Sequence, residues 1–401
     1  MTTTAITHAN LILRDEILED GAVLIEGDRI VEVGPCTSVG WRGADHVVDG
    51  EHRLFVVPGI VDTHCDSLET EVNPRPRVNF DGPFAIRNYE RRALAAGVTT
   101  SFHAVTFANM ARVERSISDA SARTDLVRSA RPTAGMDHQL LHRCDVWTPD
   151  GLPALLDSMR TMPVQAMSLN DHTPGQGQYR DLETFKKTMI AMRASDPNYD
   201  AEADIAARIA ARTNDTTTVA SVLGRLREEF EVQPFIMASH DDDSREKTEA
   251  MHALGCTIAE FPVVIDSARR ARELGMWITV GAPNIVRGGS TSGNQDATEL
   301  VREGLADIIC ADYHLPSMIM SAWHLAKNGV CTLPQAVAML TDNPARAFGL
   351  SDRGRIQVGM AADLVCAEIV DGRPVVTSTW YRGRAVFGSE VARPALAVAQ
   401  A

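Results

Sequence analysis

The 401-residue sequence lacks most features of secreted and membrane proteins. Its seven cysteines include no Cys-x-x-Cys pair, and their odd number argues against a disulfide framework. No uncharged apolar run approaches the roughly 18–20 residues that a membrane helix needs. The N-terminal stretch is polar and interrupted by acids, unlike a signal peptide. We therefore expect a cytoplasmic protein without a membrane partner.

Positive charge is also scarce. Lys and Arg total 39 against 53 Asp and Glu, which gives a formal net charge of −14. This balance argues against nucleic acid as a partner, because a phosphate backbone requires a basic surface. An anionic small molecule stays open, since a local pocket can be basic on an acidic protein. With 44% hydrophobic residues the chain can bury a sizeable core.

The sequence shows no internal repeat, but its two ends share a β-rich pattern. The stretches 5–15, 21–35, 46–59 and 362–387 alternate apolar and polar residues, with Gly or Asp at the breaks. Asp371-Gly372 predicts a tight hairpin turn in the last stretch. We expect residues 1–56 and 350–401 to meet in one small β-sandwich.

Between the ends, apolar strand-like runs alternate with helical stretches. The strand candidates are 57–64, 98–105, 138–146, 163–171, 234–241, 256–261, 277–283 and 307–312. Their alternation with helices predicts an α/β fold, a TIM-like (β/α)8 barrel over residues 57–349. The stretch 181–231 exceeds one crossover and predicts a helical excursion. Asp241–Asp243 are expected to cap a helix that ends at Gly255.

Several strand candidates end in residues that bind metals. Catalysis in parallel barrels concentrates at these strand ends. His64 and Asp66 are two residues apart, so in an extended chain their side chains point the same way. Taken singly, each such residue is more often a structural, hydrogen-bonded group. The further strand-end candidates are Asp145, Asp171, His172, His240, Glu260 and Asp312.

Taken together, these groups predict a metal site, because buried imidazoles and carboxylates are costly without a partner. Histidine and carboxylate ligands suit one or two divalent ions, with Zn²⁺ expected and Mn²⁺, Fe²⁺ or Co²⁺ as alternatives. Cys65 alternates away from the ligands and is expected to pack in the core. His103 and His142 could support the ligands from behind. His8 and His52 carry no comparable signal.

Two loops place arginines near the expected site. In residues 280–294, Arg287 accompanies a Gly-Gly-Ser-Thr-Ser-Gly run that could cradle a phosphate, although the lysine of a P-loop is absent. Arg75 and Arg77 lie among prolines soon after the first ligand pair and suggest an anionic substrate. A flexible loop and solvated arginines are the alternatives. The other predicted substrate contacts are Gln176, Glu260, Asn284 and Asn294.

Eight short motifs of the sequence resemble those of a known enzyme family. These are PGIVDTHCDSLE, NPRPRV, LNDHTPGQ, ASHDDD, LGCTIAEFP, GAPNIVRGGSTSGN, DYHLPS and TLPQAV. The layout resembles the amidohydrolase superfamily, and within it the diphosphatases of the carbon–phosphorus lyase pathway for phosphonate breakdown, from about Val57 to Leu364. The resemblance implies hydrolysis of α-D-ribose 1-methylphosphonate 5-triphosphate, or a related anionic sugar phosphate, to the 5-monophosphate and pyrophosphate. Water activated by the metal would attack the α-phosphorus.

The resemblance also implies roles for the strand-end residues. His64, Asp66, His240 and Asp312 would be metal ligands, and Asp312 would shuttle the proton of the attacking water. Asp145 would bridge two ions, although that branch tends to have Glu at this position. His172 would bind metal or contact substrate.

The chain departs from the diphosphatase pattern beside the pocket. Thr70-Glu71 stand where a basic residue and a histidine usually follow, and residues 313–317 also differ. These differences could indicate that the protein acts on a different anionic substrate. A hydrolase of C–N bonds, such as a cyclic amidase, a deaminase or an N-acyl amino acid deacylase, is a second function. A non-catalytic barrel that binds or scaffolds a partner is a third possible function. The sequence does not exclude that the chain forms a homo-oligomer.

Overall fold

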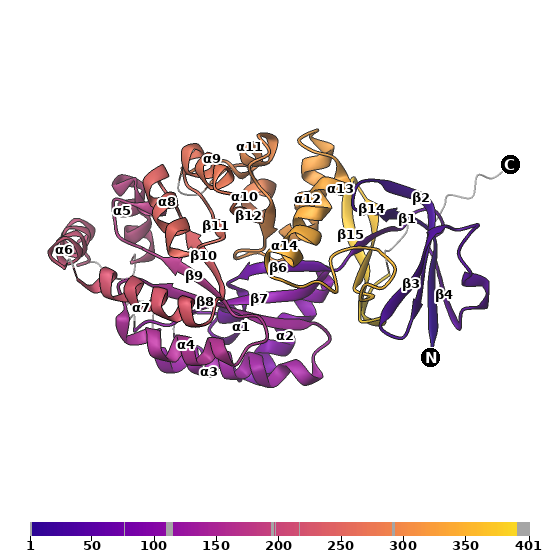
Figure 1. Cartoon of the computed structure of the whole chain (residues 1–401), viewed down its shortest axis with the longest axis horizontal. Helices are drawn as coiled ribbons and strands as arrows, with labels where there is room; N and C mark the ends of the chain where they lie inside the picture. The colour runs from indigo at the N-terminus through magenta and orange to yellow at the C-terminus, as the bar shows by residue number, and fades with distance from the viewer. Residues whose placement is uncertain are drawn as a thin grey trace.

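Two eight-stranded sheets form the protein, whose computed structural model describes residues 2–75, 77–109, 115–193, 196, 198–215, 217–290 and 293–390 (Figure 1). In one sheet every strand pairs in parallel with its neighbour in the sequence, from β6 to β13. The other sheet joins strands from both ends of the chain. The predicted parallel barrel with a terminal β-sandwich is therefore confirmed.

The barrel strands lie at the predicted places. They are β6 (Ile60–Cys65), β7 (Val98–Thr106), β8 (Asp137–Asp145), β9 (Ala166–Asn170), β10 (Ile236–His240), β11 (Ile258–Glu260), β12 (Trp277–Gly281) and β13 (Ile308–Cys310). The residues after β13 meet β6. The N–H of Asp312 donates to the carbonyl of His64 at 2.9 Å, and the N–H of Asp66 donates to the carbonyl of Asp312 at 2.9 Å. The first and last strands are thereby linked.

Helices cover the outside of the barrel (Figure 1). The crossover from β9 to β10 contains α5, α6 and α7, in the stretch where the sequence predicts an excursion. Figure 1 shows α6 at the end of the molecule opposite the N-terminal strands. The described helices are α1 (Ser67–Val72), α2 (Gly82–Ala95), α3 (Ile117–Ala130), α4 (Leu152–Arg160), α5 (Leu182–Met192), α6 (Ala201–Asn214), α7 (Thr218–Val232), α8 (Arg245–Leu254), α9 (Ile265–Glu273), α10 (Ala282–Arg287), α11 (Ala297–Arg302), α12 (Ser317–Lys327), α13 (Leu333–Leu340) and α14 (Asp342–Ala347).

The start of α8 differs from the prediction. Ser244 is its N-cap, and the Ser244 side chain accepts a hydrogen bond from the N–H of Lys247 at 3.1 Å. The predicted cap at Asp241–Asp243 is wrong, because a serine stands closer to the helix and these acids make contacts of their own beside β10. Gly255 ends the helix with a φ of +118°, as predicted.

The terminal sheet has the order β16-β15-β14-β5-β1-β2-β3, with β4 paired to β1. In Figure 1 the indigo N-terminal and yellow C-terminal strands lie side by side. Asp371 and Gly372 turn between β14 and β15 with φ values of +50° and +72°, as a tight hairpin requires. The division into domains near residues 57 and 350 stays a prediction. The strands are β1 (Thr3–Ile12), β2 (Ile17–Glu26), β3 (Arg29–Pro35), β4 (His46–Asp49), β5 (Phe55–Pro58), β14 (Leu364–Val370), β15 (Arg373–Tyr381) and β16 (Arg384–Gly388).

An apolar layer fills the barrel interior below a polar one. Side chains from β6 to β11 pack against Phe348, which follows α14. Because side chains alternate across a strand, residues two positions farther along face the same interior. On β8 to β11 those residues are polar and lie toward the carboxyl ends of the strands. The apolar layer consists of Val61, Phe102, Leu141, Ala166, Ala238 and Ile258, and the polar one of Arg143, Ser168, His240 and Glu260.

The seven cysteines all lie within the described residues, and each is a free thiol. Among the same residues, no helix is both long enough and apolar enough to cross a membrane. The cytoplasmic location stays a prediction.

Candidate metal centre and active site

His64 lies at the end of β6 with both ring nitrogens facing carboxylates. Its Nδ1 is 3.1 Å from Oε1 of Glu260, and its Nε2 is 3.8 Å from Oδ1 of Asp66. The side chains of His64 and Glu260 are each 1% exposed. The second oxygen of Glu260 accepts a hydrogen bond from Oγ of Ser168 at 2.5 Å. Glu260 therefore orients the imidazole of His64 and leaves Nε2 facing Asp66.

Glu260 was predicted to contact substrate, and its position argues against that role. Both of its oxygens already have partners within the barrel, and the side chain is buried behind His64. A carboxylate in this setting holds a ligand in place. Glu260 therefore positions the His64 ring in this structure, and its contact with substrate stays a prediction.

Asp66 approaches His64 for a reason other than the predicted one. The predicted convergence is present, but β6 ends at Cys65, and Asp66 has a helical backbone with φ of −88° and ψ of −6°. The hydrogen bond from its N–H to the carbonyl of Asp312 holds it beside the last strand. The extended-chain explanation is therefore wrong, because the chain turns before Asp66.

His240 supplies a second imidazole from the end of β10. Its Nδ1 lies 2.9 Å from Oδ2 of Asp241, which leaves Nε2 for another partner. The ring centroids of His240 and His64 are 5.7 Å apart. Burial lowers the pKa of His240 and so favours the neutral imidazole that binds metals. Candidate ligand atoms of His64, His240 and Glu260 all lie within 4.8 Å of one another. We call these three residues the barrel cluster.

Asp312 reaches the same mouth from the last strand. Its Oδ2 lies beside Gly281 at the end of β12, where a Cβ would be 3.5 Å away, in ordinary van der Waals contact. Burial raises the pKa of Asp312 to about 6, and the charge of Asp66 raises it too. Asp241, Phe261 and Asp312 each have a φ of +54°, a conformation that is uncommon outside glycine. Three strand ends thus adopt the same unusual turn around the cluster.

Arg143 is a site residue that the sequence analysis missed. Its Nη1 lies 3.3 Å from Oδ1 of Asp66, and its Nε donates to Oδ1 of Asn170 at 2.7 Å. Burial would raise the pKa of Asp66, but the charges of Arg143 and neighbouring groups outweigh it and lower that pKa. Arg143 stands two residues before Asp145 on a predicted strand, so the alternation of side chains could have placed it on the inner face.

Asp145 and His172 form a pair next to the barrel cluster. Nδ1 of His172 lies 3.6 Å from Oδ2 of Asp145, and the side chain of Asp145 is 2% exposed. The ring centroid of His172 is 6.4 Å from that of His240. The structure thus brings the six predicted ligands to one end of the barrel, and their binding of metal stays a proposal. They are His64, Asp66, Asp145, His172, His240 and Asp312.

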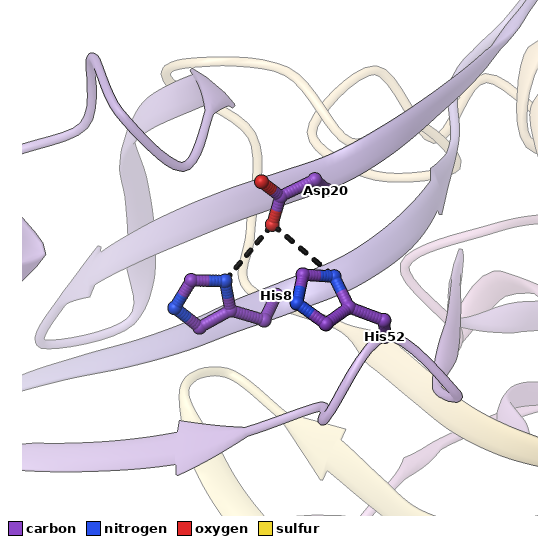
Figure 2. Close-up of side chains that lie close together, drawn as sticks. All are labelled: His8, Asp20 and His52. Carbon is purple, nitrogen blue, oxygen red and sulfur yellow. Dashed lines mark hydrogen bonds and ion pairs between the residues drawn. The ribbon is translucent and has the colours of Figure 1, made fainter.

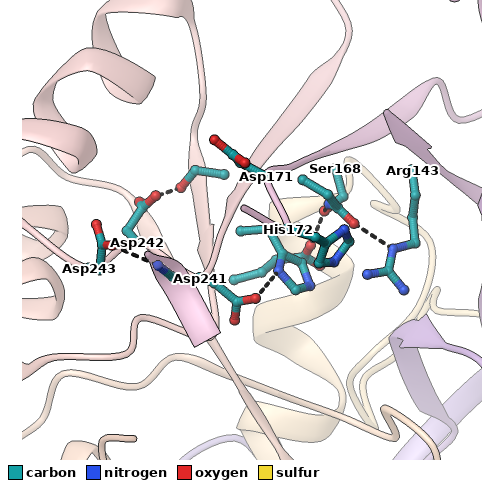
Figure 3. A network of polar contacts seen from close by, with 12 residues as sticks. Arg143, Ser168, Asp171, His172, Asp241, Asp242 and Asp243 are labelled. Atoms are coloured by element: carbon teal, nitrogen blue, oxygen red, sulfur yellow. Dashed lines mark hydrogen bonds and ion pairs between the residues drawn. The ribbon is translucent and has the colours of Figure 1, made fainter. Parts of the chain in front are cut away.

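Two acids after His240 make separate contacts, Asp242 with β10 itself and Asp243 with the loop after β9. Oδ2 of Asp242 accepts a hydrogen bond from Oγ of Ser239 at 2.6 Å, and Oδ2 of Asp243 accepts one from the N–H of Gly177 at 2.7 Å. Figure 3 shows these acids together with His172. In the same loop, Nε2 of Gln176 donates to Asp171 at 3.4 Å. Gln176 therefore supports the loop that carries His172, and its contact with substrate stays a prediction.

The predicted substrate residues after β12 differ in position. Asn284 borders the same space beside Gly281 as Asp312 does. Arg287 is exposed and donates to the hydroxyl of Tyr313, the residue after Asp312, at 3.2 Å. Oδ1 of Asn294 is buried and has no hydrogen-bond partner among the residues that the structure describes, which omit the nearby positions 291 and 292.

Thr291 and Ser292 of the predicted phosphate cradle lie outside the described residues. Arg75 and Arg77 are exposed in the segment after α1. Their binding of an anionic substrate stays a prediction.

His103 and His142 do not support the site. Nε2 of His142 lies 3.0 Å from Oγ of Ser158 in α4, and Nε2 of His103 lies 2.9 Å from Nδ1 of His138. Both rings are buried between the strands and the outer helices, because their positions alternate away from the barrel interior. The prediction that they back the ligands is wrong. Cys65, 1% exposed, packs in the core as predicted.

A divalent ion fits the chemistry of this mouth. Two buried imidazoles have one nitrogen each held by a carboxylate, which leaves the other nitrogen available. The carboxylates of Asp66 and Asp312 add oxygen donors. Nitrogen and oxygen donors without thiolate suit Zn²⁺, Mn²⁺, Fe²⁺ or Co²⁺.

Comparisons with known proteins agree with this architecture. Residues 178–386 match the model of the amidohydrolase family. The chain is 31% identical over 388 residues to the α-D-ribose 1-methylphosphonate 5-triphosphate diphosphatase of Escherichia coli, covering 95% of this chain and 100% of that protein. Among solved structures, an N-acetyl-D-glucosamine-6-phosphate deacetylase from Mycobacterium smegmatis superposes with a TM-score of 0.62 at 16% identity, covering 96% of this chain and 100% of that one. A dihydropyrimidinase from Brevibacillus agri superposes with a TM-score of 0.59 at 15% identity, covering 96% and 95%. The two structures show likeness of fold.

Proposed function

This chain belongs to the amidohydrolase family, and we propose that it cleaves the triphosphate of α-D-ribose 1-methylphosphonate 5-triphosphate, or of a related anionic sugar phosphate, to release pyrophosphate. The likeness to the Escherichia coli diphosphatase carries this proposal, because it extends over 95% of the chain. The structure supports it by placing His64, Asp66, His240 and Asp312 at one mouth of the barrel. A hydrolase with these ligands is expected to use a divalent metal.

The proposed ligands are Nε2 of His64, Nε2 of His240 and the carboxylates of Asp66 and Asp312. When bound, the ion would lower the pKa of a water molecule and offset negative charge on the phosphoryl group. Glu260 and Asp241 hold the two imidazoles through their Nδ1 atoms. Both rings are thereby oriented before substrate arrives.

Asp312 accepts the proton of the attacking water in this proposal. The water oxygen forms a bond to the α-phosphorus, and the bond from that phosphorus to the bridging oxygen breaks. Pyrophosphate leaves with the electron pair of that bond. A buried carboxylate is suited to proton transfer near neutral pH because burial favours its protonated form.

Positive charge at the mouth would bind the triphosphate. Arg143 lies beside Asp66 within the barrel, and Arg287 lies at the rim next to Tyr313. A guanidinium donates paired hydrogen bonds to phosphoryl oxygens and stabilises charge as the leaving group departs. In this proposal Asp145 and His172 would serve a second ion, and the ring centroid of His172 is 6.4 Å from that of His240.

The test is an assay of the purified protein, supplemented in turn with Zn²⁺ and Mn²⁺, on α-D-ribose 1-methylphosphonate 5-triphosphate. Pyrophosphate and orthophosphate are quantified separately. We expect one pyrophosphate per substrate, and release slowed by about 10³-fold with Asp312→Asn. Stepwise release of orthophosphate would contradict the proposed cleavage at the α-phosphorus.

A parallel panel of cyclic amides and N-acyl amino acids tests the C–N bond alternative. Turnover of an amide without turnover of the triphosphate would replace the proposed reaction. A protein that holds no metal and hydrolyses neither panel would be a binding or scaffold protein.

A further inference from the structure

Two histidines and an aspartate converge on the terminal sheet, away from the barrel (Figure 2). Nδ1 of His8, in β1, lies 2.9 Å from Oδ1 of Asp20, in β2, and Nδ1 of His52 lies 3.5 Å from the same oxygen. The two ring centroids are 5.0 Å apart. Candidate ligand atoms of all three residues lie within 4.8 Å of one another. We call His8, Asp20 and His52 the sandwich cluster.

The backbone holds these three side chains in place. His8, Asp20 and His52 have φ values of +49°, +48° and +58°, and Glu51 has a φ of +48°. Such values are uncommon in residues other than glycine. The pairing of β1 with β2 shifts register on both sides of Ala9, so that His8 lies in an irregular part of the ladder. Strained residues gathered from three segments are typical of sites that bind ligands.

Main-chain hydrogen bonds and a close approach join His8 to the segment of His52, and Asp20 to the residue after β3. The carbonyl of His8 accepts from the N–H of His52 at 2.7 Å, and the carbonyl of Asp20 accepts from the N–H of Cys36 at 2.8 Å. Gly50 packs directly on β1, since a Cβ there would lie 2.8 Å from the carbonyl oxygen of His8. The cluster is therefore preorganised by main-chain contacts.

We propose that the sandwich cluster binds one divalent transition-metal ion of the zinc class, at a site separate from the barrel. Two imidazoles and one carboxylate are a donor set that Zn²⁺ accepts. Bonds of about 2.0–2.1 Å at tetrahedral angles put neighbouring donors ~3.3 Å apart. The separations of 2.9 and 3.5 Å between the imidazole nitrogens and the carboxylate oxygen bracket that value.

The surroundings complete such a site. Nε2 of His8 lies 3.7 Å from Sγ of Cys36, which would partner the ring nitrogen that does not face the ion. The side chains of His8, Asp20 and His52 are 33%, 50% and 65% exposed, so water can fill the remaining ligand positions. An ion here ties β1, β2 and the segment before β5 together and stabilises the sandwich. This inference is independent of the proposed reaction.

The experiment measures Zn²⁺ per chain after dialysis of the full-length protein, by plasma mass spectrometry, for the wild type, Asp20→Asn and His52→Asn. Asparagine tolerates the left-handed backbone at both positions. His46→Asn is the matched control, because His46 is an exposed histidine of β4 outside the cluster. The thermal midpoint is recorded for each protein with and without added Zn²⁺.

We expect Asp20→Asn and His52→Asn each to hold one ion fewer per chain than the wild type, with hydrolytic activity unchanged. His46→Asn should match the wild type. Added Zn²⁺ should raise the thermal midpoint of the wild type more than that of either cluster variant. Equal ion content in all four proteins would overturn the proposal and leave the cluster as a hydrogen-bonded group. Because His52 is on an exposed turn, its variant keeps the test valid if Asp20→Asn fails to fold.

Discussion

The barrel cluster and the sandwich cluster use the same types of side chain in opposite surroundings. His64, His240 and Glu260 are buried, whereas each side chain of the sandwich cluster is at least 33% exposed. In the barrel each imidazole has its own carboxylate, Glu260 for His64 and Asp241 for His240. In the sandwich two imidazoles share Asp20.

The difference in solvent exposure predicts different roles for the two clusters. Within the barrel, low solvent access strengthens electrostatic interactions and raises the pKa of Asp312, which favours proton transfer. On the sandwich, solvent screens the charges and competes for the ion. We therefore expect catalysis at the barrel cluster, and binding without turnover at the sandwich cluster.

The largest expected effect tests this contrast with one substitution in each region. Asp312→Asn should lower kcat by about 10³-fold, because the proton acceptor is lost. Its fold should persist, since Asp312 links the strands through main-chain atoms and asparagine tolerates a φ of +54°. The matched change Asp20→Asn should leave kcat unchanged. Pyrophosphate release and circular dichroism measure both, and near-normal turnover by Asp312→Asn would sink the assignment.

A smaller loss should follow from Glu260→Gln. If Glu260 positions His64 through its charge, the substitution should lower kcat or the affinity for metal by about 10–100-fold. The KM for substrate should change little. A direct contact with substrate would instead raise KM. Glu228→Gln, at an exposed position of α7, is the control. The kinetic constants and metal content of the three proteins decide between the two roles.

A chelator should remove metal from the two clusters at different rates. During dialysis against EDTA, the exposed sandwich ion should leave first while activity persists, because solvent reaches its ligands. Loss of metal from the buried barrel should follow and abolish turnover. Metal content and activity are measured in the same samples. Activity that declines in step with the first ion lost would contradict the assignment of catalysis to the barrel.

Acid should destabilise the barrel through buried imidazoles such as His142. Burial lowers the pKa of His142 to about 4, and the ring is fully buried. The unfolded chain, with an ordinary histidine pKa, binds the proton first, so stability falls as the pH drops below about 6.5. We expect a contribution of about 2 kcal/mol between pH 7 and pH 5.

Denaturant titrations at the two pH values check this contribution. His142→Gln should lose less stability on acidification than the wild type does. His46→Gln on the exposed sandwich surface should behave like the wild type. An equal loss in all three proteins would show that His142 is not the source.

Much of the barrel could be predicted because its signals are local. Apolar runs separated by helical stretches marked its strands, and His64 and His240 were found because each ends such a run. Arg143 was missed because a charged residue within a strand is usually assigned to the surface. His103 and His142 were assigned to the wrong side of the barrel wall. Which side each ring faces depends on the register of β7 and β8, which the sequence did not determine.

The order of strands and the metal-binding types at their ends were determined by the sequence itself, since alternation and periodicity depend on neighbouring residues. Tertiary structure alone decided which groups meet. Glu260 reaches His64 across 196 positions of the chain, and Asp312 joins the site because the barrel closes on β6. The sandwich cluster depends on an irregular β1–β2 ladder and left-handed turns in three segments. Such contacts follow from the packing of distant strands, which no local pattern records.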